Sequence, residues 1–209
     1  MPLSELKNFH QKIWQNNLLK HANMSIKIKI PTEGNIYHFF LSLSDKVLYD
    51  FNPYPDANSK IGAKMLSQTL LKDKSQKIFG IFDGKKMAGF GFLKASPKET
   101  MKEVCQFGVV INEQYQGLGY GRTLSKGMVE SAKKNHIKKI WLTVFSDNNR
   151  AINLYKSLGF GIEGIFMRNE NFGKIRRHVI SMALFFDGDP EKERKELWDK
   201  VSKALPNYL

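Results

Sequence analysis

The stretch that decides the fold reads Phe107-Gly-Val-Val-Ile-Asn-Glu-Gln-Tyr-Gln-Gly-Leu-Gly-Tyr-Gly-Arg122. Residues 103–111 are rich in apolar and β-branched residues, which predicts a strand, and apolar residues recur at helical spacing over residues 119–134. Between them lies a loop with Gly117, Gly119 and Gly121. Glycine lets the backbone take positive φ and approach a ligand closely, and a helix start presents unpaired N–H groups at the positive end of its dipole. The stretch therefore predicts an anion site, most naturally for phosphate.

The glycine loop differs from two common phosphate-binding motifs. A Walker A loop ends in Gly-Lys-Ser/Thr, whereas this loop ends in Gly121-Arg122-Thr123. A dinucleotide fingerprint reads G-x-G-x-x-G, whereas this loop reads G-x-G-x-G and lacks the acidic residue on a following strand. A tight connection from strand to helix would use the same glycines, so the loop alone leaves both interpretations open.

Outside the loop, the sequence pattern indicates further strands and helices. We expect strands over residues 25–30, 77–82, 87–93, 103–111, 140–145, 160–166 and 178–186. We expect helices over residues 3–20, 37–48, 119–134 and 148–158, around Ile61, Met65, Leu66 and Leu70, and from Asp189-Pro190 onward. This order predicts an α/β fold with a single central mixed, mostly antiparallel sheet flanked by helices. We expect one domain at residues 25–186, between an N-terminal helical extension (1–24) and a C-terminal helix (187–209).

Composition narrows the class of protein. The chain has 209 residues, 42% hydrophobic and 25% charged, which suits one globular domain with short extensions. Its net charge of +13 is spread as +2, +5, +4 and +2 over residues 1–50, 51–100, 101–150 and 151–209, so we do not expect a nucleic-acid partner. The single Cys105 excludes an internal disulfide and a cysteine-rich zinc site, and we expect no metal. With no apolar run of membrane-spanning length and no apolar stretch in MPLSELKNFHQ, we expect a cytoplasmic protein without a membrane partner.

Two motifs together carry a resemblance to a known family. The spacing Gln116-x-x-Gly119-x-Gly121 resembles the acetyl-CoA pyrophosphate loop of the GNAT (Gcn5-related) N-acetyltransferase superfamily. Some thirty residues later, Asn148-Asn-Arg-Ala-Ile-Asn-Leu-Tyr155-Lys-Ser-Leu-Gly159-Phe160 resembles the second cofactor motif of the same superfamily. The resemblance covers residues 102–186. It implies the acyl-CoA N-acyltransferase fold and transfer of acetyl from acetyl-CoA to a primary amine.

The resemblance also implies roles for individual residues. The strand before the loop would part from its neighbour, and its free backbone groups would pair with the pantetheine arm at Val109, Val110 and Ile111. The pyrophosphate would be held mainly by backbone N–H groups of Gln116, Gly117, Leu118, Gly119, Tyr120, Gly121 and Arg122. Asn148 would contact the cofactor arm, although a plain N-cap is an equal alternative. Tyr155 would protonate the departing CoA thiolate, or else it is a tyrosine of the core.

The base is the least determined of these roles. Glu103 lies at a position of this strand where its presence resembles the ribosomal-protein N-terminal acetyltransferases, which implies that it acts as the base. The alternative is that Glu103 is a solvated carboxylate at the strand edge. Cys105 is expected to be a buried thiol rather than a nucleophile. An α-amine, with a pKa near 8, needs a base less than a lysine does, so a weak base assignment favours an α-amine acceptor.

The acceptor is expected to be a protein N-terminus or, second, a small-molecule amine. The region 37–55 would wall its pocket, with Phe39, Tyr49, Phe51 and Tyr54 as candidates. GNAT enzymes commonly carry an acidic residue shortly before the last strand, whereas this chain has Lys174, Arg176 and Arg177, which would suit an acidic acceptor better than a polyamine. An inactive CoA-binding sensor or interaction module is the alternative function, and a homodimer is conceivable.

Overall fold

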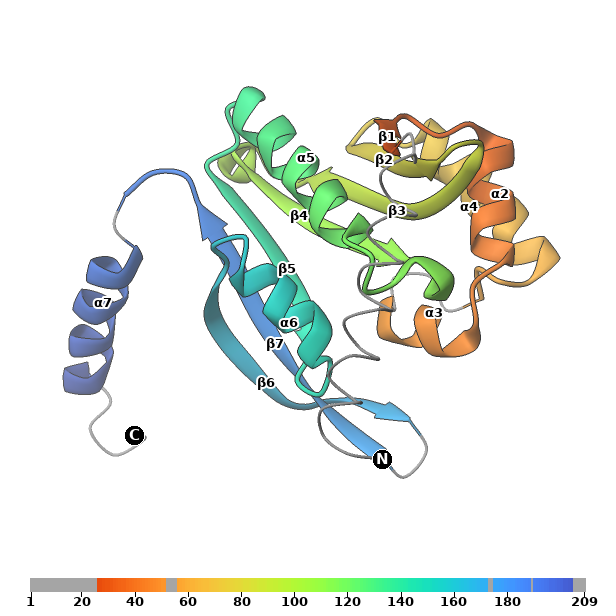
Figure 1. Cartoon of the computed structure of the whole chain (residues 1–209). Helices are drawn as coiled ribbons and strands as arrows, with labels where there is room; N and C mark the ends of the chain where they lie inside the picture. Colours follow the sequence, from red (N-terminus) through yellow and green to blue (C-terminus); the bar gives the residue numbers. More distant parts are fainter. Residues whose placement is uncertain (1–25, 52–55, 173–174, 189, 205–209) are drawn as a thin grey trace, which may run out of the picture.

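The computed structural model describes residues 26–51, 56–172, 175–188 and 190–204, and Figure 1 shows how their elements are arranged. One seven-stranded sheet has the order β1-β2-β3-β4-β5-β7-β6. Neighbouring strands are antiparallel except β4 and β5, which are parallel. The predicted mixed, mostly antiparallel sheet is therefore confirmed. Its strands are β1 (Ile26–Lys29), β2 (Gln76–Asp83), β3 (Lys86–Ala95), β4 (Val104–Ile111), β5 (Lys139–Phe145), β6 (Gly161–Phe172) and β7 (Ile175–Phe185).

The helices cover both faces of the sheet. Helices α5 (Tyr120–Lys134) and α6 (Asn149–Lys156) pack on one face, over a core that includes Phe107 of β4 and Ile140 of β5. Helices α2 (Glu33–Leu41), α3 (Asp45–Phe51) and α4 (Lys60–Lys72) pack on the other face of β2, β3 and β4, over a second core that includes Val110. Odd and even residues of β4 thus serve different cores, as the alternation of a strand requires.

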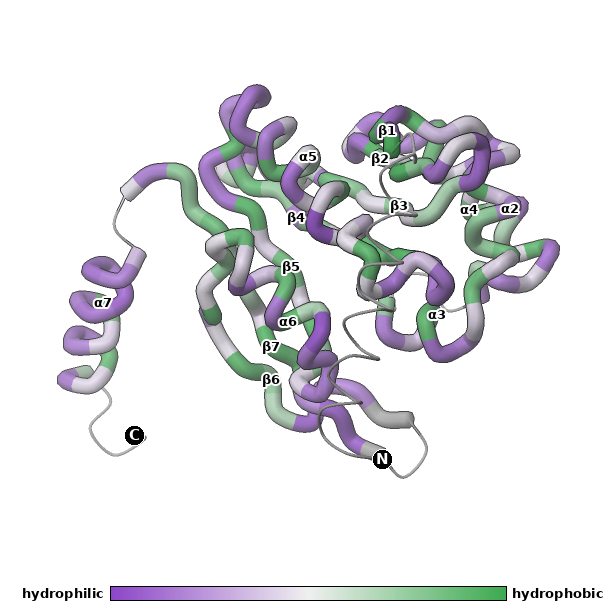
Figure 2. The backbone as a smooth tube through the Cα atoms, viewed as in Figure 1, coloured by the Kyte–Doolittle hydropathy of each residue, from purple (hydrophilic) through white to green (hydrophobic). Residues whose placement is uncertain are grey.

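The last helix, α7 (Pro190–Ala204), stands apart from the sheet beyond β6 (Figure 1). None of its residues is buried, and Leu197 and Trp198 are exposed. Figure 2 shows this helix as largely hydrophilic, in contrast to the strands of the sheet. No helix in the described part of the chain is long and apolar enough to cross a membrane.

Three details differ from the sequence prediction. The helix predicted at 37–48 is two helices, because the chain turns at Ser42 and Ser44 and the Ser44 hydroxyl accepts the N–H of Val47. The prediction that Ile61, Met65, Leu66 and Leu70 share one buried apolar face of α4 is wrong for Ile61 and Met65, which are 75% and 64% exposed. Leu66 and Leu70 are buried. Strands β6 and β7 extend further than predicted, since they form one long hairpin. The helix predicted at 3–20 and the cap at Asp189 lie outside the described residues.

The feature that positions the site is the way β4 and β5 separate. Their register comprises only Val104↔Lys139, Cys105↔Ile140 and Gln106↔Trp141. Beyond Gln106, β4 continues to pair with β3 as far as Ile111, and β5 continues to pair with β7 as far as Phe145. From Phe107 onward the register therefore gives β4 no partner on its β5 side, and the sheet opens into a V, as the resemblance implies.

Candidate active site

The glycine loop lies at the open end of this V. After β4, Asn112 is the N-cap of a short 3-10 turn (Glu113–Tyr115). Its side-chain oxygen accepts a hydrogen bond from the backbone N–H of Gln114, and its side-chain amide donates to the Ser42 hydroxyl at 3.0 Å. Gly117 and Gly119 then take φ of 78° and 86°, a conformation that favours glycine. Gly119 is the N-cap of α5 and has no side chain to bond the first-turn N–H groups. Those N–H groups are thus available to an anion, as the sequence predicts.

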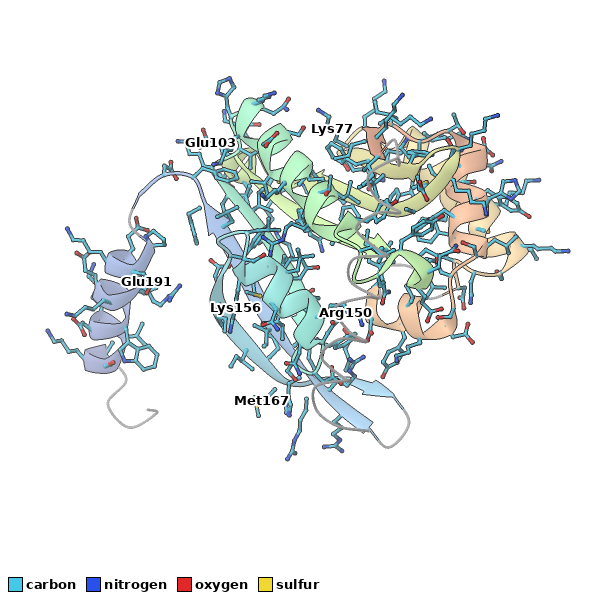
Figure 3. All side chains as sticks on the ribbon, viewed as in Figure 1. Lys77, Glu103, Arg150, Lys156, Met167 and Glu191 are labelled. Atoms are coloured by element: carbon cyan, nitrogen blue, oxygen red, sulfur yellow. The ribbon has the colours of Figure 1, made fainter. Side chains whose placement is uncertain are left out.

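A polar bridge crosses the open end of the V beside the loop. The side-chain amide of Gln116 donates to the carbonyl oxygen of Ile111 at 3.0 Å, and its oxygen accepts a hydrogen bond from the guanidinium of Arg150. Ile111 is the last residue of β4 and Gln116 lies in the loop after it, whereas Arg150 lies in the first turn of α6 (Figure 3). Arg150 is a candidate site residue that sequence reasoning missed, although it stands only two residues after Asn148 in the second motif.

Most side chains in the segments predicted to bind the cofactor, residues 109–111 and 116–122, pack against the protein core. Val109 and Ile111 pack against one core and Val110 lies in the other, so their backbone groups are what a ligand could use. Tyr120 is fully buried against Tyr115, and burial raises the pKa of its hydroxyl to about 12. The remaining loop positions differ in exposure: Leu118 packs against the core, while Arg122 is exposed in the first turn of α5.

Asn148 is the N-cap of α6. Its side-chain oxygen accepts the N–H of Ala151 at 3.1 Å, which is the plain structural role that the sequence left open. A contact between Asn148 and a cofactor stays a prediction.

Tyr155 lies on α6 at the point where the two strands part. Its ring meets Phe107, the first residue of β4 beyond the paired segment, edge to face at 6.0 Å between centroids. It also packs near Phe160 and is 6% exposed. Burial raises the pKa of the Tyr155 phenol, so the hydroxyl keeps its proton at neutral pH and can act as a donor.

Glu103 lies at the closed end of the strand pair. Its carboxylate accepts a hydrogen bond from Lys138 at 3.1 Å, and the side chain is 47% exposed. It precedes Phe107 by four residues, or about 13 Å of extended strand. Figure 3 shows Glu103 and Arg150 at opposite ends of this region. The structure thus does not bring Glu103 together with Tyr155, and the geometry gives no support to its predicted role as base.

Cys105, two residues further along β4, is buried. Burial raises the pKa of its thiol to about 12, which keeps the sulfur protonated and unreactive. Within the described residues, no three His, Cys, Asp or Glu side chains gather in a way that could hold a metal ion.

A small hollow opens on the face of the sheet that carries α3. Its lining comes from the end of α3, the end of β5 and the β6–β7 hairpin, and consists of Asp50, Phe51, Thr143, Val144, Phe145, Glu170 and Val179. Residues 143–145 belong to the part of β5 that no longer pairs with β4. The hollow therefore borders the β5 side of the V, next to α3. Of the aromatic residues expected to wall the acceptor pocket, Phe51 lines the hollow, Phe39 is core, and Tyr54 lies outside the described residues.

Of the basic residues expected to favour an acidic acceptor, Arg177 is already paired within the protein. Arg177 is 8% exposed and bonded to the carboxylates of Asp50 and Asp147. Its charge is therefore compensated within the protein. Arg176 is exposed, and Lys174 lies outside the described residues. Arg177 therefore gives no support to the expectation of an acidic acceptor, which stays a prediction that rests on Arg176 and Lys174.

Comparison with known proteins gives one consistent family. The model of the acetyltransferase (GNAT) family matches residues 42–160. The [ribosomal protein bS18]-alanine N-acetyltransferase of Escherichia coli is 32% identical over 91 residues, which cover 44% of this chain and 58% of that protein. The spermidine N(1)-acetyltransferase of Escherichia coli is 27% identical over 117 residues, covering 55% and 61%. The chain thus spans less than two thirds of the length of these curated relatives.

Solved structures show the same fold. A GNAT-family acetyltransferase from Streptococcus pneumoniae superposes with a TM-score of 0.66 at 21% identity, covering 78% of this chain and all of that one (100%). The protein yncA of Salmonella typhimurium, whose structure was determined with its cofactor acetyl-CoA, has a TM-score of 0.65 at 16% identity and covers 79% and 96%.

Proposed function

Because the chain belongs to the acetyltransferase (GNAT) family, we propose that it transfers the acetyl group of acetyl-CoA to a primary amine. The observation that carries this proposal is the separation of β4 from β5 beside a glycine loop that begins α5. We assign the transfer to residues 25–186. Helix α7 contributes none of the residues assigned to this site.

The chain's own groups fit acetyl-CoA at the open end of the V. The loop at 116–122 offers backbone N–H groups at a helix start for the pyrophosphate, and Arg122 and Arg150 add positive charge beside it. The unpaired edge of β4 from Phe107 to Ile111 offers backbone groups for the amide-containing pantetheine arm. In this arrangement the reactive end of the cofactor would come to lie near Phe107 and Tyr155.

Acetyl-CoA supplies the acetyl group as a thioester, and the chain has two groups to assist its transfer. The N–H of Val109 would donate to the acetyl oxygen as negative charge develops on it. Tyr155 would donate its phenolic proton to the sulfur that leaves, since burial keeps that proton in place. The amine would enter through the hollow beside Thr143 and Phe145, on the opposite face.

For the acceptor we favour a protein N-terminus over a small-molecule amine. Strand β4 (Val104–Ile111) carries no carboxylate or imidazole that could act as a base. An α-amine, with a pKa near 8, is roughly a tenth neutral at pH 7. A lysine-like amine, with a pKa near 10.4, would depend far more on a base.

The test is release of free CoA thiol over a panel of amines, including peptides with N-terminal alanine, serine or methionine, and spermidine. We expect turnover with at least one peptide, and a fall in kcat of roughly 100-fold in Tyr155→Phe. Thr69→Val, which removes an exposed hydroxyl on α4 that bonds the carbonyl oxygen of Met65, is the control and should keep wild-type rates. Tight acetyl-CoA binding without turnover on any amine would instead support the inactive CoA-binding module.

A further inference from the structure

Arg177 contacts three separate segments of the chain with one buried side chain. Its guanidinium donates to the Oδ1 atom of Asp50 in α3 at 3.2 and 3.3 Å. It also donates to Asp147 in the loop between β5 and α6. The guanidinium carbon lies 3.7 Å from the ring centre of Phe145 and 4.8 Å from that of Tyr49.

These segments belong to the two halves of the sheet that the V separates: one half contains β1 to β4, and the other contains β5, β7 and β6. Helix α3 belongs with β1 to β4, since Val47 and Leu48 lie in the core on that side and the Phe51 ring packs 6.3 Å from Phe92. Arg177 and Phe145 belong with the strand pair β5 and β7. At the closed end the halves are joined by backbone pairing of β4 and β5, which ends at Gln106. Arg177 therefore joins them by side-chain contacts at the open end.

Arginine suits this position for chemical reasons. A planar guanidinium can donate to two carboxylates in its plane while its faces contact aromatic rings, which a lysine ammonium cannot do. Burial acts to lower the pKa of Arg177, but the hydrogen bonds and charge of Asp147 and Asp50 outweigh it and hold the pKa above its usual range. The Arg177 side chain therefore stays positively charged at neutral pH.

We propose that Arg177 is a positioning residue that sets the acceptor side of the site. Through Asp50 it holds the end of α3, which lines the hollow, and through Asp147 it holds the residue before the N-cap of α6, the helix that carries Tyr155. This inference rests on the proposed acetyl transfer. It predicts a division of effects, because the acceptor wall and Tyr155 depend on Arg177 whereas the glycine loop does not.

The experiment compares Arg177→Met, Arg177→Lys and Asp50→Asn with wild type. The matched control is Lys139→Met, since Lys139 likewise pairs with a carboxylate, Glu163 at 2.6 Å, and contacts a ring, Phe185 at 5.1 Å, but at the closed end. Two readouts are used. Hydrogen–deuterium exchange without substrate reports on α3, and steady-state kinetics use the panel amine that the wild type acetylates fastest.

We expect Arg177→Met to lose exchange protection in α3 while α4 keeps its protection. We expect kcat/KM for the amine to fall roughly 10- to 100-fold, because a small misplacement of reacting groups has effects of that size. The dissociation constant for acetyl-CoA should rise less than kcat/KM for the amine falls, because the loop at 116–122 lies in the other half and only Arg150, at the start of α6, depends on the Arg177–Asp147 contact. Arg177→Lys should recover part of the loss, and Lys139→Met should behave as wild type.

Equal loss of acetyl-CoA and amine affinity, or unchanged α3 exchange, would overturn the proposal. If Arg177→Met does not fold, Asp50→Asn decides, because it removes the negative charge from the α3 contact while Asp147 still neutralises Arg177. Unchanged kinetics in that variant would contradict the inference. Failure of the proposed function is recognised separately, since wild type would then acetylate no amine of the panel, whereas the exchange readout on α3 would still test the contact.

Discussion

The two ends of the β4–β5 pair are built differently. At the closed end, backbone pairing joins the strands over Val104 to Gln106, and the ion pair of Glu103 with Lys138 lies half exposed beside it. At the open end, the pairing is gone, and polar side chains span the gap: Gln116 with Arg150 on the α6 side, and Arg177 with Asp50 and Asp147 on the α3 side. An exposed ion pair contributes little to stability, whereas removing one partner of a buried pair leaves a charge without compensation, so we expect changes at the open end to have the larger effects.

The largest effect should come from the proton donor at the open end. Tyr155→Phe removes the hydroxyl but leaves the ring against Phe107, so we expect the fold and acetyl-CoA affinity to be kept and kcat to fall roughly 100-fold. The release of CoA thiol over time, at saturating acetyl-CoA and amine, measures kcat. A Tyr155→Phe enzyme with wild-type kcat would show that the phenol is only a core residue.

The next effect concerns the glycine loop. Gly119 has φ of 86° with open space around it, and Gly84, in the β2–β3 turn, has φ of 57° with open space as well. Alanine at either position costs about 1–2 kcal/mol of backbone strain. Only Gly119→Ala should also raise the KM for acetyl-CoA, by roughly 10-fold, because it disturbs the first N–H groups of α5. Equal KM values for the two variants would mean that the loop is a structural connection alone.

A third effect separates stability from activity. In Arg177→Met the carboxylates of Asp50 and Asp147 remain 35% and 65% exposed and can be solvated. We therefore expect the free energy of unfolding to fall by about 1–2 kcal/mol, below the range for a fully buried pair. Urea unfolding followed by circular dichroism measures this change. No change would mean that the two halves do not depend on this contact.

The smallest effect should come from the closed end. Glu103→Gln weakens the exposed pair with Lys138, and we expect no measurable change in Tm and less than about 2-fold change in kcat/KM, as is usual for exposed pairs. The pH dependence of kcat/KM is the discriminating measurement. If Glu103 is the base after all, the variant will lose the acidic limb of that profile.

The local sequence pattern predicts most of the strands and helices, but it does not predict the contacts between distant segments that surround the site. Strand alternation and the glycine turn predicted β4, α5 and their order, because these signals lie within short windows. The exposure of Ile61 and Met65 and the pairing of Arg177 depend on which elements meet in space, which periodicity does not encode. For the same reason the sequence does not reveal that Glu103 lies at the closed end of the strand pair, bonded to Lys138.

The most direct test of the central claim is hydrogen–deuterium exchange with and without acetyl-CoA, resolved along β4 and the loop that follows. The account predicts that acetyl-CoA protects amides of residues 107–111 and 116–122, and leaves those of residues 104–106 unchanged because they are already paired with β5. Protection that is absent from both segments, or that appears only at the closed end near Glu103, would contradict a cofactor site in the open V.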